Sequence, residues 1–453
     1  MTYKAISFRA WGSVLLTLVI LSGVPAAENG SALSEIGRLV NDLPLSADAS
    51  KAAATPSGSP GLLPIGEGMI PIEELDSVSP VPGQRTAGTP DDQRQKLQID
   101  LNDNSEMSRE LTLLRGNVRK CLAIYRQKHE NAATRSPWGI MHAMITFGAE
   151  TEIYASGHKK NAIGWLCWNN ACRGMRLLRL ENGRIQGNEG PGLQGHAGQF
   201  LALLAQCGVK SSSPIRVSGR DFTVADLIAS EMASCKPKTE LTFKLIGLSH
   251  YLKSDTAWRT SDGERWDIPR LIKEELAQPI VGAACGGTHR MMGFSYSVRV
   301  REKRGEPVTG EWLRAQKYVK DYVEYTFRLQ NPDGSFSTKF YEGRGNSSDI
   351  QERLRTTGHL LEWLVFTMPE DRLLDPRLLA AVKYLSQLML RNQDEKWEVG
   401  PKGHAVRALV LFDKRVSGRS TWPQARRRGL LASGDDERNR KSLVSVAWAV
   451  VID

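Results

Sequence analysis

The sequence predicts a mostly helical protein in which about six helical hairpins recur along the chain. From Ser108 onward, apolar residues recur at helical spacing. Helices with one polar face alternate with helices that are apolar on all sides, as expected of outer and inner helices. Five of the eight histidines stand near the front of an apolar run, shortly after a glycine: His142, His196, His289, His359 and His404. This repeated position indicates internal repeats and a shared central cavity.

The N-terminal residues have the pattern of an export signal. Lys4 and Arg9 precede the apolar stretch 14–21, and small residues at 24 and 26 fit a cut after Ala26. We therefore expect residues 1–26 to be a signal peptide and the protein to be exported to the periplasm, the cell envelope or the medium. An uncleaved membrane anchor is the alternative. No later segment reaches the roughly 20 apolar residues of a membrane span.

Composition divides the rest of the chain into three parts. Residues 27–100 are rich in Ala, Ser, Pro and Gly and predict a disordered linker. Residues 101–413 carry the helical pattern, and residues 414–453 form a basic tail. The net charge is +10, and the stretch 413–441 alone holds nine basic and four acidic residues. Such a run is typical of a solvated segment and gives no specific signal for nucleic acid.

The helices expected from the pattern fall into two classes. The expected outer helices span residues 110–125, 221–235, 268–284, 311–329 and 376–391. The expected inner helices span residues 139–154, 195–207, 240–252, 289–300, 359–366 and 404–412. Segments 175–180 and 183–187 flank a tight-turn sequence and predict one small β-hairpin.

The spacing of the inner helices supports a helical-pair repeat. Taken at His142, His196, Leu241 and the three later histidines, successive starts differ by 54, 45, 48, 70 and 45 residues. The longest step contains a Gly-, Ser- and charge-rich insertion at residues 339–355. The third repeat has Leu241 where the others have histidine, so the architecture does not require an imidazole at that position.

Six cysteines in an exported protein raise the question of disulfides. Most lie in apolar runs, where a cysteine behaves as a small buried apolar residue. We expect mostly reduced, buried thiols. Cys167 and Cys172, close in sequence, are the pair best placed to form a bridge.

One segment resembles a known repeat. Leu329-Gln-Asn-Pro-Asp-Gly-Ser-Phe336 is similar to the Gln-x-x-x-Gly-x-Trp/Phe repeat of terpenoid cyclases and protein prenyltransferases, with degenerate copies at 392–397 and 262–266. The resemblance implies an all-α fold, an α/α toroid of about six helical hairpins. The chain lacks the Asp-x-Asp-Asp motif of class II cyclases, so terpene cyclisation is not expected.

A second resemblance concerns metal binding. Cys285-Gly-Gly-Thr-His289 looks like the glycine-led zinc histidine of protein prenyltransferases and lanthionine cyclases. Segments 165–167 and 195–198 are also similar to lanthionine-cyclase elements. The Cys-His-Gly motif of the cyclases and the Asp-x-Cys pair of the prenyltransferases are missing from the chain. We therefore assign no metal ligands and no cofactor, and keep a zinc-dependent enzyme as a second alternative function.

A third resemblance concerns carbohydrate chemistry. Gly358-His359-Leu-Leu-Glu362-Trp is similar to a helix start in N-acylglucosamine 2-epimerase-like (α/α)6 proteins, and segment 400–407 resembles their second histidine segment. His359 and Glu362 are three residues apart and so face one side of a helix. A His/Glu pair can pass protons at a sugar carbon. The two segments lie one hairpin apart here, closer than in that family.

The sequence favours a binding function over catalysis. We expect a cell-envelope protein that binds a ligand or partner, such as a glycan, at the central cavity; its oligomeric state stays open. A carbohydrate-active enzyme of epimerase or polysaccharide-lyase type is the first alternative. The candidate catalytic residues are His289, His359, Glu362 and His404. The candidate ligand-binding residues are His196, Trp165, Tyr251, Arg290 and Trp363.

Overall fold

The computed structural model describes residues 109–417, and this part of the chain is mostly helical. The predicted signal peptide 1–26, the predicted linker 27–100 and nearly all of the predicted tail 414–453 lie outside the described residues. The last helix, α13 (Val399–Ser417), continues past residue 413, where the domain was expected to end. Among the described residues, no helix combines the length and the hydropathy needed to cross a bilayer.

Six buried helices make a closed cycle of contacts. They are α3 (Pro137–Phe147), α5 (Gln199–Gln206), α7 (Thr242–Tyr251), α9 (Thr288–Lys303), α11 (Ile350–Thr367) and α13. Each packs against the next in this order, and α13 packs in turn against α3. All six inner helices expected from the apolar runs are therefore present.

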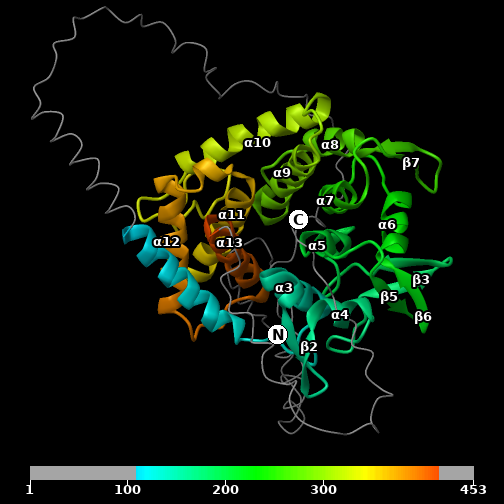
Figure 1. Cartoon of the computed structure of the whole chain (residues 1–453), viewed down its shortest axis with the longest axis horizontal. Coiled ribbons are helices and arrows are strands. Elements are labelled where there is room, and N and C mark those ends of the chain that lie inside the picture. Colours follow the sequence, from blue (N-terminus) through cyan, green and yellow to red (C-terminus); the bar gives the residue numbers. More distant parts are fainter. Residues whose placement is uncertain (1–108, 418–453) are drawn as a thin grey trace, which may run out of the picture. The chain divides into compact units, whose positions relative to one another are not determined.

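A second set of helices alternates with the first along the chain. It comprises a helix over residues 109–126 and α4 (Ala162–Cys167), α6 (Val224–Ala233), α8 (Ile268–Leu276), α10 (Gly310–Arg328) and α12 (Pro376–Arg391). Figure 1 shows α6, α8, α10 and α12 outside the inner helices, against which they pack. Three short 3-10 helices, η3 (Gly148–Glu150), η4 (Ala284–Gly287) and η5 (Glu370–Arg372), lie in the connections.

Capping residues fix several helix starts. Asp375 accepts a hydrogen bond from the Arg377 backbone N–H at 2.9 Å at the start of α12, and Pro376 is its first residue. Asp267 caps α8 in the same way. Thr223 and Asp226 form a capping box at the start of α6. The Asp375 cap and Pro376 explain why the predicted start of the span 376–391 is confirmed, and the helix also ends at the predicted residue.

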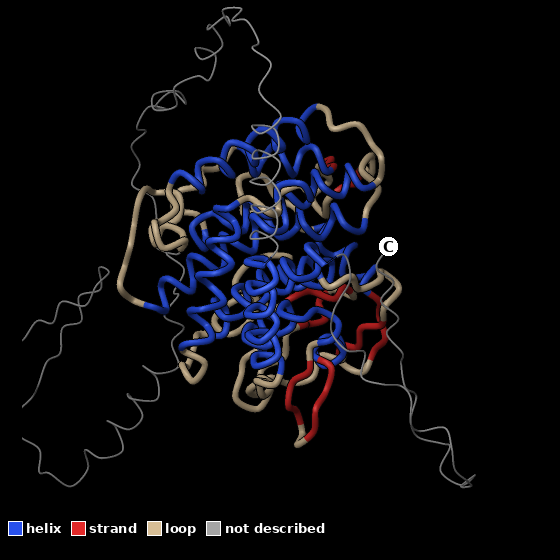
Figure 2. The backbone as a smooth tube through the Cα atoms, turned by 60° about the vertical axis from the view of Figure 1, so that its left-hand side comes forward, coloured by secondary structure: helices blue, strands red, loops and turns tan. Residues whose placement is uncertain are grey.

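Four two-stranded antiparallel sheets interrupt the first half of the domain. The pairs are β1 (Glu152–Ala155) with β2 (His158–Asn161), β3 (Leu178–Glu181) with β4 (Arg184–Gly187), β5 (Pro214–Val217) with β6 (Arg220–Thr223), and β7 (Ala257–Arg259) with β8 (Arg265–Asp267). Figure 2 shows most strands gathered at one side of the helices. The sequence predicted the β3–β4 pair but missed the other three.

Two of the three missed hairpins, β1–β2 and β5–β6, share a turn that sequence patterns signal weakly, and the third has a longer loop, residues 260–264, between β7 and β8. In the first three hairpins both turn residues have positive φ, as in Ser156-Gly157 and Ser218-Gly219, which is the geometry of a type I′ turn. The detected hairpin uses Asn182-Gly183, and asparagine tolerates positive φ better than serine does. Short strands with a Ser-Gly turn therefore escaped detection.

Some expected helices differ from those in the structure. The inner helix expected over 139–154 ends at Phe147, and β1 follows; the outer helix expected over 268–284 ends at Leu276. The helix carrying His359 begins at Ile350, so His359 lies in its middle rather than at its front. The insertion expected at 339–355 is therefore helical from residue 350. The six-residue α4 was not predicted, because it is too short to show a helical period.

The glutamine-led segment after α10 ties two hairpins together. Gln330 donates hydrogen bonds to the carbonyls of Gly334 and Arg377, both at 2.9 Å. Gly334 has φ +89°, and a Cβ there would lie 2.6 Å from the Ala380 carbonyl oxygen. Phe336 is fully buried. The segment thus anchors the loop after α10 to the first turn of α12.

The six cysteines form no disulfide. Cys167 and Cys172, the pair expected to bridge, are instead separate buried thiols, and burial raises the pKa of Cys167 to about 12. Cys121, Cys207 and Cys235 are buried as well. These five cysteines act as small core residues, as predicted, whereas Cys285 is exposed.

Candidate functional site

The five glycine-led histidines meet at one place. The His289 ring centroid lies 5.8 Å from that of His196, 5.6 Å from that of His359 and 5.4 Å from that of His404. The His404 ring lies 3.9 Å from the His359 ring and 5.6 Å from the His142 ring. We call these five residues the histidine cluster. They line one central location and are not spread over five separate helix–helix seams.

Four inner helices and the turn before α5 supply the cluster. His289 is the second residue of α9, whereas His142, His359 and His404 lie within α3, α11 and α13. His196 precedes α5. The convergence therefore comes from the packing of the inner helices and not from a common position at helix N-termini. Close helix packing makes it possible: a Cβ at Gly403 would lie 2.5 Å from the His142 carbonyl oxygen, and one at Gly358 would lie 3.0 Å from Ala405.

A small cavity of about 30 Å³ opens beside four of the five rings. Its wall includes Gln199, Phe243, Thr288, Glu362 and Trp363 together with four cluster histidines: His142, His289, His359 and His404. This volume has room for about one water molecule or an ion.

Backbone carbonyls fix the tautomers of two cluster histidines. His359 Nδ1 lies 2.7 Å from the Arg355 carbonyl oxygen, and His142 Nδ1 lies 2.8 Å from the Trp138 carbonyl oxygen. Since a carbonyl oxygen only accepts, each Nδ1 carries the proton and donates it. The Nε2 atom of each ring therefore holds a lone pair.

Carboxylates orient two further rings. His404 Nδ1 lies 2.5 Å from Glu362 Oε2, and His196 Nδ1 lies 2.7 Å from Glu240 Oε2. Arg407 Nε lies 2.9 Å from the other oxygen of Glu362 and forms an ion pair with it. Burial raises the pKa of Glu362, and the neighbouring Arg407 opposes that shift. Glu362 therefore joins a histidine of α13 to α11.

Burial keeps four of the five cluster histidines uncharged at neutral pH. It lowers the pKa of His142 and of His404 to about 3. It also holds the pKa values of His289 and His359 well below their usual range, and the neighbouring imidazoles add to the effect. Neutral imidazoles are the form that binds metal ions or accepts hydrogen bonds.

Several cluster nitrogens are buried without a hydrogen-bond partner in the described part of the chain. They are both ring nitrogens of His289 and the Nε2 atoms of His359 and His404. The His289 ring itself is only partly buried. An unpaired buried polar atom costs about 1–3 kcal/mol of stability. Four such atoms lie together in this cluster.

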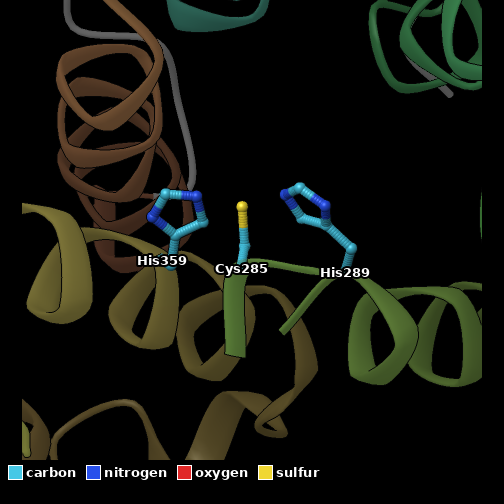
Figure 3. Close-up of side chains that lie close together, drawn as sticks. All are labelled: Cys285, His289 and His359. Atoms are coloured by element: carbon cyan, nitrogen blue, oxygen red, sulfur yellow. The ribbon is translucent and has the colours of Figure 1, made fainter. Parts of the chain in front are cut away.

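The thiol of Cys285 lies close to two of these histidines. Its Sγ and one nitrogen each of His289 and His359 all lie within 4.8 Å of one another, and Figure 3 shows the thiol between the two imidazoles. Cys285 has φ +49° and ψ +41°, and Gly286 and Gly287 follow with positive φ. A left-handed non-glycine residue is uncommon, and backbone strain of this kind clusters at functional sites.

A larger cleft lies on the other side of His142. Its volume is about 400 Å³, and its wall comes from the helix over 109–126, α3, η3, β1, β2 and α13. Basic and acidic side chains alternate around it, among them Lys128, Glu130 and Lys402. Lys402 forms an ion pair with Glu130. His142 is the one residue that lines both the cleft and the small cavity.

The structure brings together the four residues predicted as catalytic candidates. His289, His359, Glu362 and His404 all line the small cavity, and so does Trp363, one of the predicted ligand-binding residues. His196 belongs to the cluster through its contact with His289.

Three predicted ligand-binding residues do not line the small cavity, and each has a contact elsewhere. The Trp165 indole donates to the Ala171 carbonyl at 3.3 Å, and the Tyr251 hydroxyl donates to the Val209 carbonyl at 2.8 Å. Arg290 Nε donates to Glu275 Oε2 at 2.9 Å. Local motifs could not separate these contacts from a cavity lining, because partners such as Val209 and Glu275 lie 15 or more residues away.

The site contains residues that the sequence candidates left out. His142 carried the same glycine-led signal as the others. Cys285 was noted only through its resemblance to a zinc motif. Arg407 lies three residues after His404 and so falls on the same helix face. For Glu240, the partner of His196, no sequence signal was available.

The comparisons with known proteins identify no relative. No family model, no curated protein and no solved structure matches the chain.

Proposed function

We propose that residues 109–417 form an α/α toroid whose central cavity is a ligand-binding site built on the histidine cluster. The observation that carries the proposal is the convergence of five histidines, three of which keep buried ring nitrogens without partners in the described region. The cycle of contacts among the inner helices supports the toroid, since it places successive repeats around one centre.

A purely structural role explains these residues poorly. The third inner helix, α7, contributes an apolar side chain to the same cavity wall: the Phe243 ring lies 4.8 Å from that of His196 and 5.1 Å from that of His289. An apolar side chain at such a position leaves no polar atom unpaired, whereas each unpaired imidazole nitrogen lowers stability. A ligand that binds to the lone pairs of these imidazole nitrogens removes this loss of stability.

The size of the cavity limits the ligand. Sites for small organic molecules usually measure about 300–1,000 Å³, tenfold more than the 30 Å³ beside the cluster. The cavity therefore suits an ion or a molecule the size of water. A sugar ring requires the neighbouring cleft.

A carbohydrate-active enzyme is the second candidate, and one observation favours it. The cleft of about 400 Å³ falls in the range of small-molecule sites, and it reaches His142, whose ring lies 5.6 Å from that of His404. In this alternative the Glu362–His404 pair moves the proton and the cleft holds the sugar. Loss of a glycan activity in Glu362→Gln with an unchanged melting temperature supports this alternative.

The proposal includes export, on the basis of the basic start, the apolar stretch 14–21 and the small residues before Ala27. When the full chain is expressed in a bacterial host, the protein recovered outside the cytoplasm is expected to begin at Ala27. Recovery of only the uncut chain in the cytoplasm contradicts export and leaves the cavity proposal unaffected.

The ligand-site proposal is tested by replacing an unpaired histidine with an apolar residue of similar volume. For His289→Leu in ligand-free protein, we expect the free energy of unfolding to stay within about 1 kcal/mol of wild type or to rise, because two unpaired nitrogens are removed. Urea denaturation followed by circular dichroism measures it.

His250→Leu is the matched control. His250 is a largely buried histidine outside the cluster, and its Nδ1 lies 2.9 Å from the Tyr296 hydroxyl. Loss of that hydrogen bond is expected to lower the free energy of unfolding by about 1–2 kcal/mol. If His289→Leu loses as much as His250→Leu or more, the cluster is a packing element and the proposal fails.

A further inference from the structure

We propose that the ligand of the histidine cluster is a late first-row divalent transition-metal ion, Zn²⁺ by its donor set, held by Cys285, His289 and His359. This inference rests on the proposed function, since it names the ligand of the same cavity. Its three donors come from η4, α9 and α11. They are close in space although 74 residues separate Cys285 from His359 in the sequence.

The spacing of the donors suits one small ion. Zinc bond lengths of about 2.0–2.3 Å imply donor atoms roughly 3.3–3.6 Å apart in a tetrahedral site. The three donor atoms are within 4.8 Å of one another, so side-chain movements of about an ångström close the site. Figure 3 shows all three side chains projecting toward the same region.

The two imidazoles have nitrogen lone pairs that are available to a metal ion. His359 Nδ1 donates its proton to the Arg355 carbonyl oxygen, 2.7 Å away, and this leaves the buried Nε2 with a lone pair and no partner among the described residues. A hydrogen bond behind the ring is the usual arrangement for a metal-bound histidine, because it fixes the tautomer and the ring orientation. Both nitrogens of His289 are buried and unpartnered in the same region.

The backbone around Cys285 holds its thiol toward the imidazoles. Thr288 Oγ donates to the Cys285 carbonyl at 2.8 Å. The next two glycines cannot carry a side chain: a Cβ at Gly286 would lie 2.1 Å from the Phe340 ring, and one at Gly287 would lie 2.8 Å from the Ile280 carbonyl oxygen. This packing maintains the strained left-handed conformation at Cys285, and a metal–thiolate bond explains why the strain is kept.

The donor types select the ion. One thiolate and two imidazoles suit zinc and its neighbours, whereas Ca²⁺ and Mg²⁺ require oxygen ligands. Three protein ligands leave a fourth position for water or another donor, as in catalytic zinc sites. His404 is the nearest further imidazole, with its ring 3.9 Å from His359 and 5.4 Å from His289. Glu362 holds its Nδ1, and its Nε2 is buried without a partner in the described region.

Cobalt titration of the untagged full chain tests the inference. After chelation and dialysis, Co²⁺ is added and the absorption spectrum recorded, with Zn²⁺ affinity measured by competition. We expect one equivalent of Co²⁺ to give a thiolate-to-cobalt charge-transfer band and the visible bands of a tetrahedral site. Zn²⁺ is expected to displace it.

Two variants and two matched controls locate the ligands. Cys285→Ser is expected to remove the charge-transfer band, and His359→Gln to weaken Zn²⁺ binding by more than roughly tenfold. Cys235→Ser, at a buried core thiol, and His250→Gln, at a histidine outside the cluster, are expected to retain both. Circular dichroism confirms that each variant is folded. Cys285 is exposed, so its replacement by serine is expected to leave the fold intact.

Two outcomes overturn the inference: wild-type protein that gives no charge-transfer band, or a band that survives in Cys285→Ser. A thiol that reacts rapidly with iodoacetamide, equally with and without Zn²⁺, also contradicts it and indicates a nucleophilic cysteine. These results are separate from the test of the proposed function. If the metal experiment fails while His289→Leu keeps its stability, the cavity still binds a ligand, but not through these donors.

Discussion

Two buried polar centres of this domain are built in opposite ways. At Glu275, both carboxylate oxygens accept hydrogen bonds. The donors are the Leu241 N–H at 2.7 Å, the Thr242 hydroxyl at 2.5 Å and Arg290 Nε at 2.9 Å. In the histidine cluster, buried nitrogens of three rings have no partner in the described region. A saturated centre holds helices together, whereas the unpaired nitrogens of the cluster are the basis of the ligand site that we propose.

The two centres also differ in charge. The first contains a buried carboxylate paired with the guanidinium of Arg290, and these charges fix α8 against α9 and the start of α7. In the second, burial lowers the pKa of His142 and His404 and so keeps these imidazoles neutral, with Glu362 and Arg407 behind them. The difference suggests that acid and mutation affect the two centres differently.

The largest expected effect is acid unfolding of the metal-free protein. Burial lowers the pKa of His142 and His404 from 6.5 to about 3 and that of His250 to about 4. Between these values and pH 6.5 the unfolded chain binds more protons than the folded one. Stability is therefore complete above pH 6.5 and falls as the pH drops below it.

Each of these histidines is expected to contribute a slope of up to about 1.4 kcal/mol per pH unit. Together they are expected to unfold the protein between pH 5 and pH 4. Urea denaturation at a series of pH values measures the slope, and NMR titration of the histidine resonances assigns it. A free energy of unfolding that is flat from pH 6.5 to pH 4.5 contradicts the prediction.

The next largest effect is expected at the saturated centre. Glu275→Ala leaves the Arg290 guanidinium buried without its carboxylate and is expected to lower the free energy of unfolding by about 3–5 kcal/mol. Chemical denaturation at pH 7.5 measures it. Glu275 is 0% exposed, so water cannot replace the lost acceptor. A loss below about 1 kcal/mol, comparable to a surface pair, means that the network does not hold the fold.

The smallest effect is expected for the glutamate behind His196. The side chain of Glu240 is 35% exposed and lies 2.7 Å from His196 Nδ1. Glu240→Gln is expected to change the free energy of unfolding by less than about 1 kcal/mol, because solvent screens the interaction and an amide oxygen can still accept. The same denaturation series measures it. A loss as large as that of Glu275→Ala removes the distinction between the two centres.

The fold was predictable from the sequence as far as its helices are concerned. Apolar periodicity located the six inner helices and five of the six outer ones, and Asp375-Pro376 fixed the start of α12. The pattern failed where tertiary packing or turn geometry overrides local preference. The hairpins with Ser-Gly turns and the short α4 were missed, and α11 starts nine residues before the histidine that was expected to begin it.

The candidate site was predictable only in part. The glycine-led pattern identified the histidines, and helical spacing placed His359 and Glu362 on one face. It did not show that Glu362 contacts His404 of another helix and not His359 of its own, or that Arg290 belongs to the Glu275 network. Those contacts depend on the angle and depth at which neighbouring helices pack, which residue spacing does not encode.

By itself, the sequence determined that inner and outer helices alternate and that five inner segments carry a histidine after a glycine, because helical periodicity and helix breakers are local properties of the chain. The tertiary structure decided what those histidines do. Closing the contacts from α3 round to α13 brings residues up to 262 positions apart to one point. The same packing sets Cys285 in a left-handed turn between two imidazoles. Helix packing, and no local motif, made one site out of repeated residues.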